Sequence, residues 1–125
     1  MDNIRLISVI DDDDSVRESL HRLIRSAGFA VKVFASAEEF LKSDHFRDTH
    51  CLILDVRMPA MNGLELQRLL VGAANEIPVI FITAHGDETA RSQALKRGAV
   101  GYLLKPFSKE ALTRRVEQAL ARLSR

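Results

Sequence analysis

Apolar and polar positions alternate in blocks along the chain, and these blocks predict five strands and five helices. Five short runs are mostly apolar and are bounded by polar or turn-forming residues, which is typical of buried strands. They cover residues 4–10, 29–34, 51–55, 78–83 and 99–104. Elsewhere apolar residues recur three and four positions apart, which is typical of helices with one buried face. We expect helices over residues 15–27, 37–41, 64–70 and 89–97, and a last helix that begins at Ser108.

Strands that alternate with helices in this way predict a doubly wound α/β fold, in which helices cover both faces of a five-stranded parallel sheet. Crossovers between parallel strands are right-handed, which leaves few topologies. One of these has the strand order 2-1-3-4-5, and its ligand crevice lies where the order reverses, between strands one and three. The chain has 125 residues, so we expect one domain over residues 1–125.

The third predicted strand organises the rest of the chain. It runs from Cys51 through three more apolar residues to Asp55, and Pro59 follows four positions later. Such a run predicts a strand that is buried on both faces, and ligands of these sheets bind outside the carboxyl ends of the strands. Asp55 therefore lies at the edge of the sheet where a ligand would bind and react. A plainer interpretation is that Asp55 only caps the loop, because most exposed acids are merely solvated.

Polar residues also mark the ends of three other predicted strands. Asp11 and Asp12 follow the first strand, Thr83 ends the fourth, and Lys105 follows the fifth. With the order 2-1-3-4-5, the first two acids meet Asp55 at one crevice. Carboxylates that leave room for water suit a hard divalent cation such as Mg²⁺.

The four consecutive acids at positions 11–14 repel one another, and a bound cation would offset this repulsion. A helix N-terminus also favours acids through its dipole, with Asp14 or Ser15 as the N-cap. Both interpretations can hold, because the earlier acids can bind metal while the later ones cap the helix.

Lys105 and Thr83 add two groups to this site that can bind an anion. The ammonium of Lys105 can pair with Asp55 or with a group attached to it, and the Thr83 hydroxyl can donate one hydrogen bond. A phosphoryl acceptor needs these groups, because cation and ammonium neutralise the phosphoryl oxygens while the carboxylate attacks phosphorus in line.

The chain resembles the response-regulator receiver family of two-component signalling from about residue 4 to residue 123. In this order and spacing the matching residues are highly specific: Asp11-Asp12, Asp55 with Met58-Pro59, Gly63, Thr83-Ala84 and Lys105-Pro106-Phe107. Segments 16–20, 27–29, 54–59, 82–87 and 104–107 are similar to the FixJ-type branch of that family. The resemblance implies the flavodoxin-like (CheY-like) form of the predicted fold.

The resemblance implies a role for each site residue. Asp55 is expected to accept the phosphoryl group, with Thr83 and Lys105 holding its oxygens. Tyr102 matches the family's switch aromatic, which is expected to turn inward when Thr83 moves. A plainer interpretation of Tyr102 is a surface aromatic on a strand.

The resemblance also implies the ligands of the metal ion. Asp12 is expected to bind Mg²⁺ directly, and Asp11 mainly through water. Asp55 and the backbone carbonyl of Arg57 are expected to complete the protein ligands.

A receiver is expected to take phosphate from a sensor histidine kinase and to act as a signalling module rather than a metabolic enzyme, with self-phosphorylation and self-dephosphorylation its only reactions. The fourth predicted helix has a weak apolar face of Ala90, Ala94 and Leu95, which is typical of loosely held elements. The FixJ-type resemblance implies that phosphorylation changes the surface of this helix and the fifth strand, which then forms a homodimer. It also implies a LuxR-type, helix-turn-helix DNA-binding domain beyond residue 125, which would make any contact with DNA.

The composition bears on the cellular compartment and on the possible classes of partner. The net charge of +1 points neither to nucleic acid nor to a membrane surface. A single cysteine excludes an internal disulfide and fits a reducing compartment. No apolar stretch is long enough to span a bilayer, and the N-terminus lacks a secretory signal. We therefore predict a cytoplasmic protein without a membrane partner.

Two other functions compete with the receiver. A Mg²⁺-dependent aspartyl phosphohydrolase would use Asp11 and Asp13, which have the right spacing, but Asp14-Ser15 follow and no cap domain is present. A flavodoxin-like FMN carrier would need a phosphate loop after the first strand, where four acids would instead repel the FMN phosphate.

Overall fold

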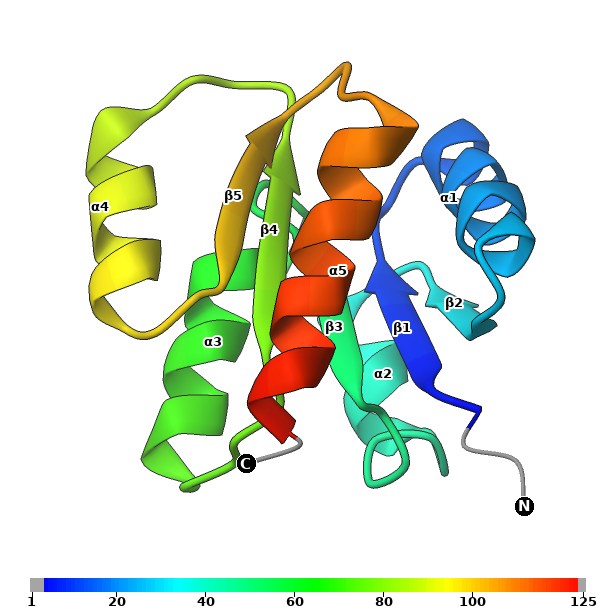
Figure 1. Cartoon of the computed structure of the whole chain (residues 1–125). Helices are drawn as coiled ribbons and strands as arrows, with labels where there is room; N and C mark the ends of the chain where they lie inside the picture. The colour runs from blue at the N-terminus through cyan, green and yellow to red at the C-terminus, as the bar shows by residue number, and fades with distance from the viewer. Residues whose placement is uncertain (1–3, 124–125) are drawn as a thin grey trace.

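The computed structural model describes residues 4–123, and its five strands form one parallel sheet. The strands are β1 (Leu6–Ile10), β2 (Ala30–Phe34), β3 (Cys51–Asp55), β4 (Val79–Thr83) and β5 (Gly101–Leu104). They pair in the order β2-β1-β3-β4-β5 (Figure 1). Both the predicted fold class and the predicted strand order are therefore confirmed.

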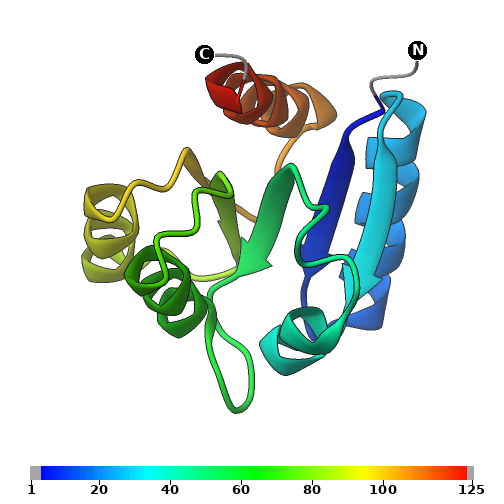
Figure 2. The same ribbon diagram turned by 90° about the horizontal axis from the view of Figure 1, so that it is seen from below.

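Five helices cover the two faces of the sheet. They are α1 (Asp14–Ser26), α2 (Ala37–Lys42), α3 (Gly63–Gly72), α4 (Glu88–Lys96) and α5 (Lys109–Leu123). Helices α1 and α5 lie on one face, and α2, α3 and α4 lie on the other (Figures 1 and 2). Within residues 4–123, no helix combines the length and the apolar character needed to cross a membrane.

Each face of the sheet has its own hydrophobic core. Beneath α1 and α5 the buried residues include Ile7, Val9, Leu20, Ile24, Ile53, Ile80, Leu112 and Val116. Beneath the other three helices they include Ile10, Phe40, Leu52, Leu54, Leu66, Leu70, Phe81 and Ala94. Every residue of β3 and β4 is buried, so these strands form the centre of the sheet and fix the position of Asp55 at the end of β3.

Cys51 opens β3 and is fully buried, as expected of a small hydrophobic residue in this strand. Burial raises the pKa of its thiol to about 12. The thiolate is therefore strongly disfavoured, and the side chain contributes packing rather than chemistry.

The apolar faces of α3 and α4 differ from those that the sequence predicts. Leu69 on α3 is 43% exposed and Leu95 on α4 is 37% exposed, whereas the polar Gln67 is buried. The inward face of α3 is made by Gly63, Leu66, Gln67 and Leu70, which lie three and four positions apart. Leu69 falls outside that stripe, and α4 buries only its alanines.

The N-cap of α1 is Asp13, so the predictions of Asp14 and Ser15 are wrong. Asp13 has an extended backbone, and one carboxylate oxygen accepts hydrogen bonds from the N–H groups of Ser15 (2.8 Å) and Val16 (3.2 Å). The helix begins one residue earlier than predicted, because its first turn accommodates Asp14, an acid that the helix dipole favours.

Candidate functional site

The carboxyl ends of β1 and β3 bring three carboxylates together. Asp11 and Asp12 follow β1, and Asp55 ends the neighbouring β3. One carboxylate oxygen from each residue lies within 4.8 Å of the other two. Asp11 is fully buried and Asp55 is 6% exposed, whereas Asp12 is exposed. The site is thus a carboxylate cluster that is closed on the sheet side and open to solvent at Asp12.

Asp11 is held in place through both carboxylate oxygens. Its Oδ1 accepts a hydrogen bond from the Asp13 backbone N–H (2.9 Å), and its Oδ2 accepts one from Lys105 Nζ (2.9 Å). The Arg17 guanidinium donates to its backbone carbonyl (2.7 Å). Because both oxygens are engaged, Asp11 is less free than the exposed Asp12 to contact a cation directly.

The pKa of the Asp55 carboxyl group is raised well above its usual value. Burial raises the pKa of its carboxyl group to about 6, and the negative charge of Asp11 adds to the increase. The Lys105 ammonium and a hydrogen bond from the Arg57 backbone N–H oppose it. A carboxylate held in this way gains from any cation that enters the site, because the cation relieves both the burial and the repulsion.

This raised pKa predicts a pH-dependent stability difference between the metal-free protein and its Asp55→Asn variant. Between about pH 4 and about pH 6 native Asp55 keeps its proton while the unfolded chain has lost it, so the free energy of unfolding falls as the pH rises through that window. Above it, the cost of charged Asp55 is about 2–3 kcal/mol. Asp55→Asn lacks this cost and should be more stable than the wild type by about that amount at about pH 8.

Urea unfolding with a chelator present, at about pH 4 and about pH 8, measures this difference. The advantage of Asp55→Asn should shrink toward zero at the lower pH. Asp44→Asn makes the same change at an exposed position and should show no such trend. An advantage that is equal at both pH values would contradict the assignment.

Lys105 reaches the cluster from the end of β5. Its Nζ lies 2.9 Å from Asp11 Oδ2 and 3.8 Å from Asp55 Oδ2. The predicted ion pair with Asp55 is present, but the shorter contact is to Asp11, whose carboxylate is completely buried and has the greater need of a partner. The Lys105 backbone N–H also donates to the Thr83 carbonyl (2.8 Å), which ties the ends of β4 and β5 together.

Thr83 ends β4 beside Asp55. The Val56 N–H donates to the Ile82 carbonyl (3.3 Å), so the two strand ends stay in register. Thr83 is 1% exposed, and its Oγ1 accepts a hydrogen bond from the His85 backbone N–H (3.2 Å). Among residues 4–123 this hydroxyl accepts but donates no hydrogen bond, and donation to an anion stays a prediction.

Gly63 is one of the residues that carry the family resemblance, but sequence reasoning missed its close approach to Asp55. Its N–H donates to the Val56 carbonyl (2.9 Å), so α3 begins directly against the end of β3. A Cβ at this position would overlap the backbone carbonyl oxygen of Asp55 and would lie 3.1 Å from the Phe81 ring. The sequence does indicate where α3 begins, because Asn62 and Glu65 form a capping box that places the helix start at Gly63.

A second missed residue is Glu38 on α2. Its Oε2 accepts a hydrogen bond from the Met61 backbone N–H (3.2 Å). This contact holds the loop that follows Asp55, which also carries Arg57. The two partners are 23 positions apart, and no local pattern in the sequence relates them.

Tyr102 on β5 packs against Phe81, with ring centroids 6.1 Å apart. Its hydroxyl is buried and has no hydrogen-bond partner among residues 4–123. Burial raises the pKa of the phenol, and the nearby Asp87 adds to the increase. The structure thus places Tyr102 between the core and the loop after β4, while its movement on phosphorylation stays a prediction.

Asp13, the second acid that a phosphohydrolase would use, is a helix N-cap and is not part of the carboxylate cluster. Its carboxylate caps α1, and Asp14 pairs with Arg17. Asp55 rather than Asp13 shares the cluster with Asp11 and Asp12, so the geometry favours the receiver interpretation over the hydrolase.

Comparison with known proteins agrees with this geometry. The family model described as response regulator receiver domain matches residues 7–117. TodT, a response regulator protein of Pseudomonas putida, is 44% identical over 119 residues, which are 95% of this chain and 52% of TodT. The transcriptional regulatory protein FixJ of Bradyrhizobium diazoefficiens is 40% identical over 114 residues, which are 91% of this chain and 56% of FixJ. The chain spans about half the length of these curated relatives.

Solved structures give the same result. The crystal structure of FixJ-N superposes with a TM-score of 0.85 at 38% identity, covering 97% of this chain and 96% of that one. The match to the family model extends from β1 into α5 and so includes every strand and every acid of the cluster. The chain therefore belongs to the response-regulator receiver family.

Proposed function

We propose that this chain is the phosphorylation-controlled receiver of a two-component system and that Asp55 accepts the phosphoryl group of a sensor histidine kinase. The main support for this proposal is that one edge of the sheet brings together Asp11, Asp12, Asp55 and Lys105 Nζ. This edge is where ligands of doubly wound sheets bind. Membership of the receiver family supports the proposal and implies a kinase partner.

In the proposed reaction a carboxylate oxygen of Asp55 attacks the phosphorus of a phosphohistidine. The new O–P bond forms as the P–N bond breaks, and the electron pair returns to the imidazole of the kinase. Lys105 would leave its contact with Asp11 to hold a phosphoryl oxygen, and the Thr83 hydroxyl would donate to another. Attack of water on the acyl phosphate returns free Asp55, so transfer from small donors and self-dephosphorylation are the reactions expected of the chain itself.

Mg²⁺ is the proposed cofactor, and the donor set fits it. Hard divalent cations prefer oxygen ligands and retain several waters, and the exposed Asp12 leaves that side of the cluster open. Asp12, Asp55 and the Arg57 backbone carbonyl would hold the ion, with Asp11 acting through water. When bound, the ion neutralises charge on the phosphoryl oxygens.

Metal binding should stabilise the wild type but not Asp12→Ala. At about 100 times its dissociation constant, Mg²⁺ is expected to raise the free energy of unfolding by about 2.7 kcal/mol. Removing the exposed carboxylate of Asp12 should abolish most of that increase and raise stability in the absence of metal, because a like charge is lost from the cluster. Thermal unfolding across a Mg²⁺ titration measures both effects.

Asp14→Ala is the matched control, because it removes a carboxylate two positions away that pairs with Arg17. Its Mg²⁺-dependent increase in Tm should match that of the wild type. A full increase in Asp12→Ala would refute the ligand assignment.

We further propose that phosphorylation changes the surface over residues 87–104 and promotes a homodimer. The α4 helix buries only two alanines, so little packing opposes its displacement. Lys105 and Thr83 are joined by a backbone hydrogen bond (2.8 Å), and movement of either toward a phosphoryl group would therefore move β5 and Tyr102. Packed elements of this kind switch between discrete arrangements.

Thr83→Ala should still accept a phosphoryl mimic at Asp55 but should dimerise less than the wild type. The substitution removes the hydroxyl that would bind the mimic and pull β4, and a ligand shifts an equilibrium only through its differential affinity for the two states. Sedimentation velocity with beryllofluoride and Mg²⁺ measures dimerisation, and ¹⁹F NMR verifies that both proteins carry the mimic. Equal dimerisation of both would show that Thr83 is not the coupling residue, and a wild type that stays monomeric would exclude the dimer.

The output of the switch is proposed from the relatives. FixJ and TdiR are named transcriptional regulatory proteins, and the chain covers 58% of a full-length FixJ structure. We propose that residues 1–125 are one receiver domain and that a LuxR-type DNA-binding domain follows residue 125 and makes any contact with DNA. A cytoplasmic location stays a prediction that rests on the single cysteine and the composition.

A further inference from the structure

Arg17 on α1 is not one of the residues assigned to the phosphoryl site, yet it contacts the backbone of that site. Its Nη1 donates a hydrogen bond of 2.7 Å to the backbone carbonyl of Asp11, six positions earlier in the chain. The Arg17 side chain is 17% exposed, so its guanidinium is largely shielded from water. A shielded cation requires strong hydrogen-bond partners, and the Asp11 carbonyl is one of them.

The carbonyl that Arg17 contacts belongs to the peptide group between Asp11 and Asp12. Two other bonds hold Asp11 on its other sides: its backbone N–H donates to the Phe34 carbonyl at the end of β2 (3.1 Å), and its Oδ1 accepts from the Asp13 N–H (2.9 Å). Peptide groups are planar, so fixing this carbonyl also fixes the direction in which the chain enters Asp12.

Asp12 depends on its backbone more than the other two acids of the cluster do. Asp11 and Asp55 are buried and are held by their surroundings, whereas Asp12 is exposed and lies in the connection between β1 and α1. The position of an exposed side chain in a connection is set mainly by the backbone that carries it. The bond from Arg17 to the preceding carbonyl therefore orients the acid that is expected to bind Mg²⁺ directly.

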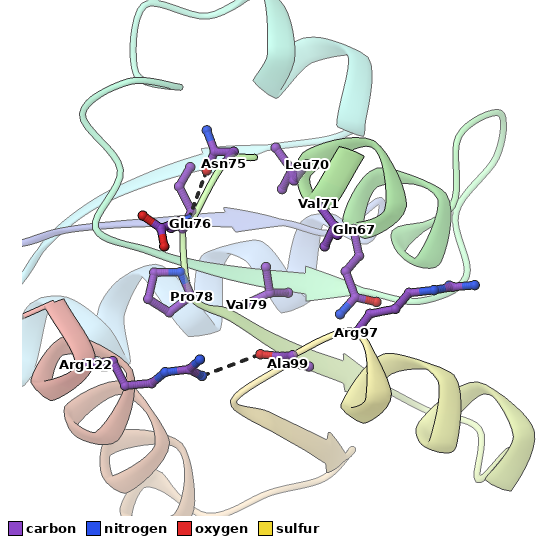
Figure 3. A pocket seen from close by; sticks show the side chains of 12 residues that line it. Gln67, Leu70, Val71, Asn75, Glu76, Pro78, Val79, Arg97, Ala99 and Arg122 are labelled. Atoms are coloured by element: carbon purple, nitrogen blue, oxygen red, sulfur yellow. Dashed lines mark hydrogen bonds between the residues drawn. The ribbon is translucent and has the colours of Figure 1, made fainter. Parts of the chain in front are cut away.

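Other arginines of the described chain have different surroundings. Arg22 pairs with Glu18 on the surface of α1, where both side chains are at least 70% exposed. Arg97 and Arg122 line a pocket at the opposite end of the sheet, and the guanidinium of Arg97 points away from Arg122 (Figure 3). That pocket shares no residue with the phosphoryl site. Of these four arginines, Arg17 is therefore the one that can act on the site.

The second partner of Arg17 is Asp14, and this contact contributes less. The Asp14 side chain is 90% exposed, and exposed ion pairs add little stability. Without the Asp14 carboxylate the guanidinium still has the Asp11 carbonyl as a partner. Asp14→Ala therefore remains a suitable control for Mg²⁺ binding.

We propose that Arg17 is a positioning residue of the metal site, because its bond to the Asp11 carbonyl holds Asp12 where it can bind Mg²⁺. This inference rests on the proposed function, since it takes Asp12 as a ligand of the ion. The guanidinium also carries a positive charge, which by itself repels a cation. Positioning and charge therefore have opposite effects on Mg²⁺ affinity, and a substitution that removes both shows which effect is larger.

Arg17→Met removes the charge and the donors but keeps a long side chain. Loss of a group that orients a metal ligand typically costs at least tenfold in affinity, so Mg²⁺ should bind about tenfold more weakly to this variant. Arg17→Lys keeps the charge but lacks the planar fork, and it should bind Mg²⁺ about threefold more weakly. Titration of the ¹⁵N-labelled proteins with MgCl₂, followed by NMR at the amides of Val56 and Arg57, gives each dissociation constant.

Arg22→Met is the matched control, because it removes an exposed arginine from the same helix. Its dissociation constant for Mg²⁺ should equal that of the wild type. Phosphorylation by acetyl phosphate separates positioning from a general distortion of the site. At low Mg²⁺ the rate for Arg17→Met should be about tenfold below that of the wild type, and at saturating Mg²⁺ the two rates should agree, because the nucleophile is unchanged.

Several outcomes would overturn the inference. One is an Arg17→Met variant that binds Mg²⁺ as tightly as the wild type, or more tightly. Another is a slow phosphorylation of this variant that persists at saturating Mg²⁺. If Arg17→Met does not fold, wild-type affinity in Arg17→Lys would overturn the inference instead. A wild type that binds no Mg²⁺ would refute the proposed cofactor and this inference with it, so the two failures are distinguishable.

Discussion

Asp55→Asn should accept no phosphoryl group from acetyl phosphate in the presence of Mg²⁺, whereas the wild type should accept one. The amide has no negative charge and is not a nucleophile toward phosphorus, while the rest of the cluster is unchanged. The neighbouring carboxylates are not expected to replace it, because both oxygens of Asp11 accept hydrogen bonds and the exposed Asp12 is the proposed direct ligand of the cation. Intact-protein mass spectrometry after a short incubation measures the product.

Asp14→Asn is the matched control for this loss, because it makes the same change at an exposed acid near the cluster. It should be labelled like the wild type. Thermal unfolding of both variants establishes that each is folded, and Asp55→Asn is expected to be the more stable. Undiminished labelling of Asp55→Asn would remove the central claim of the proposed function.

Gly63→Ala should lower the free energy of unfolding by about 3 kcal/mol, the upper end of what overpacking costs. The new methyl group would overlap the Asp55 carbonyl oxygen, which is backbone in a fully buried strand and cannot move aside, and would also press on the Phe81 ring. The start of α3 would have to shift away from β3, and the loop carrying Arg57 would shift with it. Urea unfolding gives the stability change.

Gly72→Ala provides a control in the same helix. Nothing lies within 4 Å of a Cβ at that position, and alanine favours a helix by about 1 kcal/mol over glycine. This variant should therefore be unchanged or more stable, although the chemical change is identical. A small effect of Gly63→Ala, equal to that of Gly72→Ala, would show that the close approach of α3 to β3 is not maintained in solution.

The fold could be predicted from the sequence because its main determinants are local. Each strand is a short apolar run and each helix has a periodic apolar stripe, so both kinds of element can be recognised within a few residues. The strand order was one of few compatible with right-handed crossovers. Predictions failed where tertiary packing decides: Leu69 and Leu95 are apolar but exposed, and Gln67 is polar but buried.

The candidate site was predictable for a related reason. Parallel strands bring their carboxyl ends to one edge, so Asp55 was expected beside Asp11 and Asp12 before any geometry was known. The exact partner of Lys105 was not predictable, because its choice between Asp11 and Asp55 depends on side-chain burial. The contact of Glu38 with the Met61 backbone was equally hidden, since it joins elements that no local pattern connects.

Cys51 gives the protein an internal reporter of local opening. It is the single thiol of the chain, it is fully buried, and it begins the strand that ends at Asp55. A thiol reagent can reach its sulfur only when the core beneath α1 and α5 opens, so the labelling rate reads the free energy of that opening in the native protein. Mg²⁺ or beryllofluoride bound at the far end of β3 should therefore slow a covalent reaction at the near end, which makes occupancy of the site measurable without labelling the site itself.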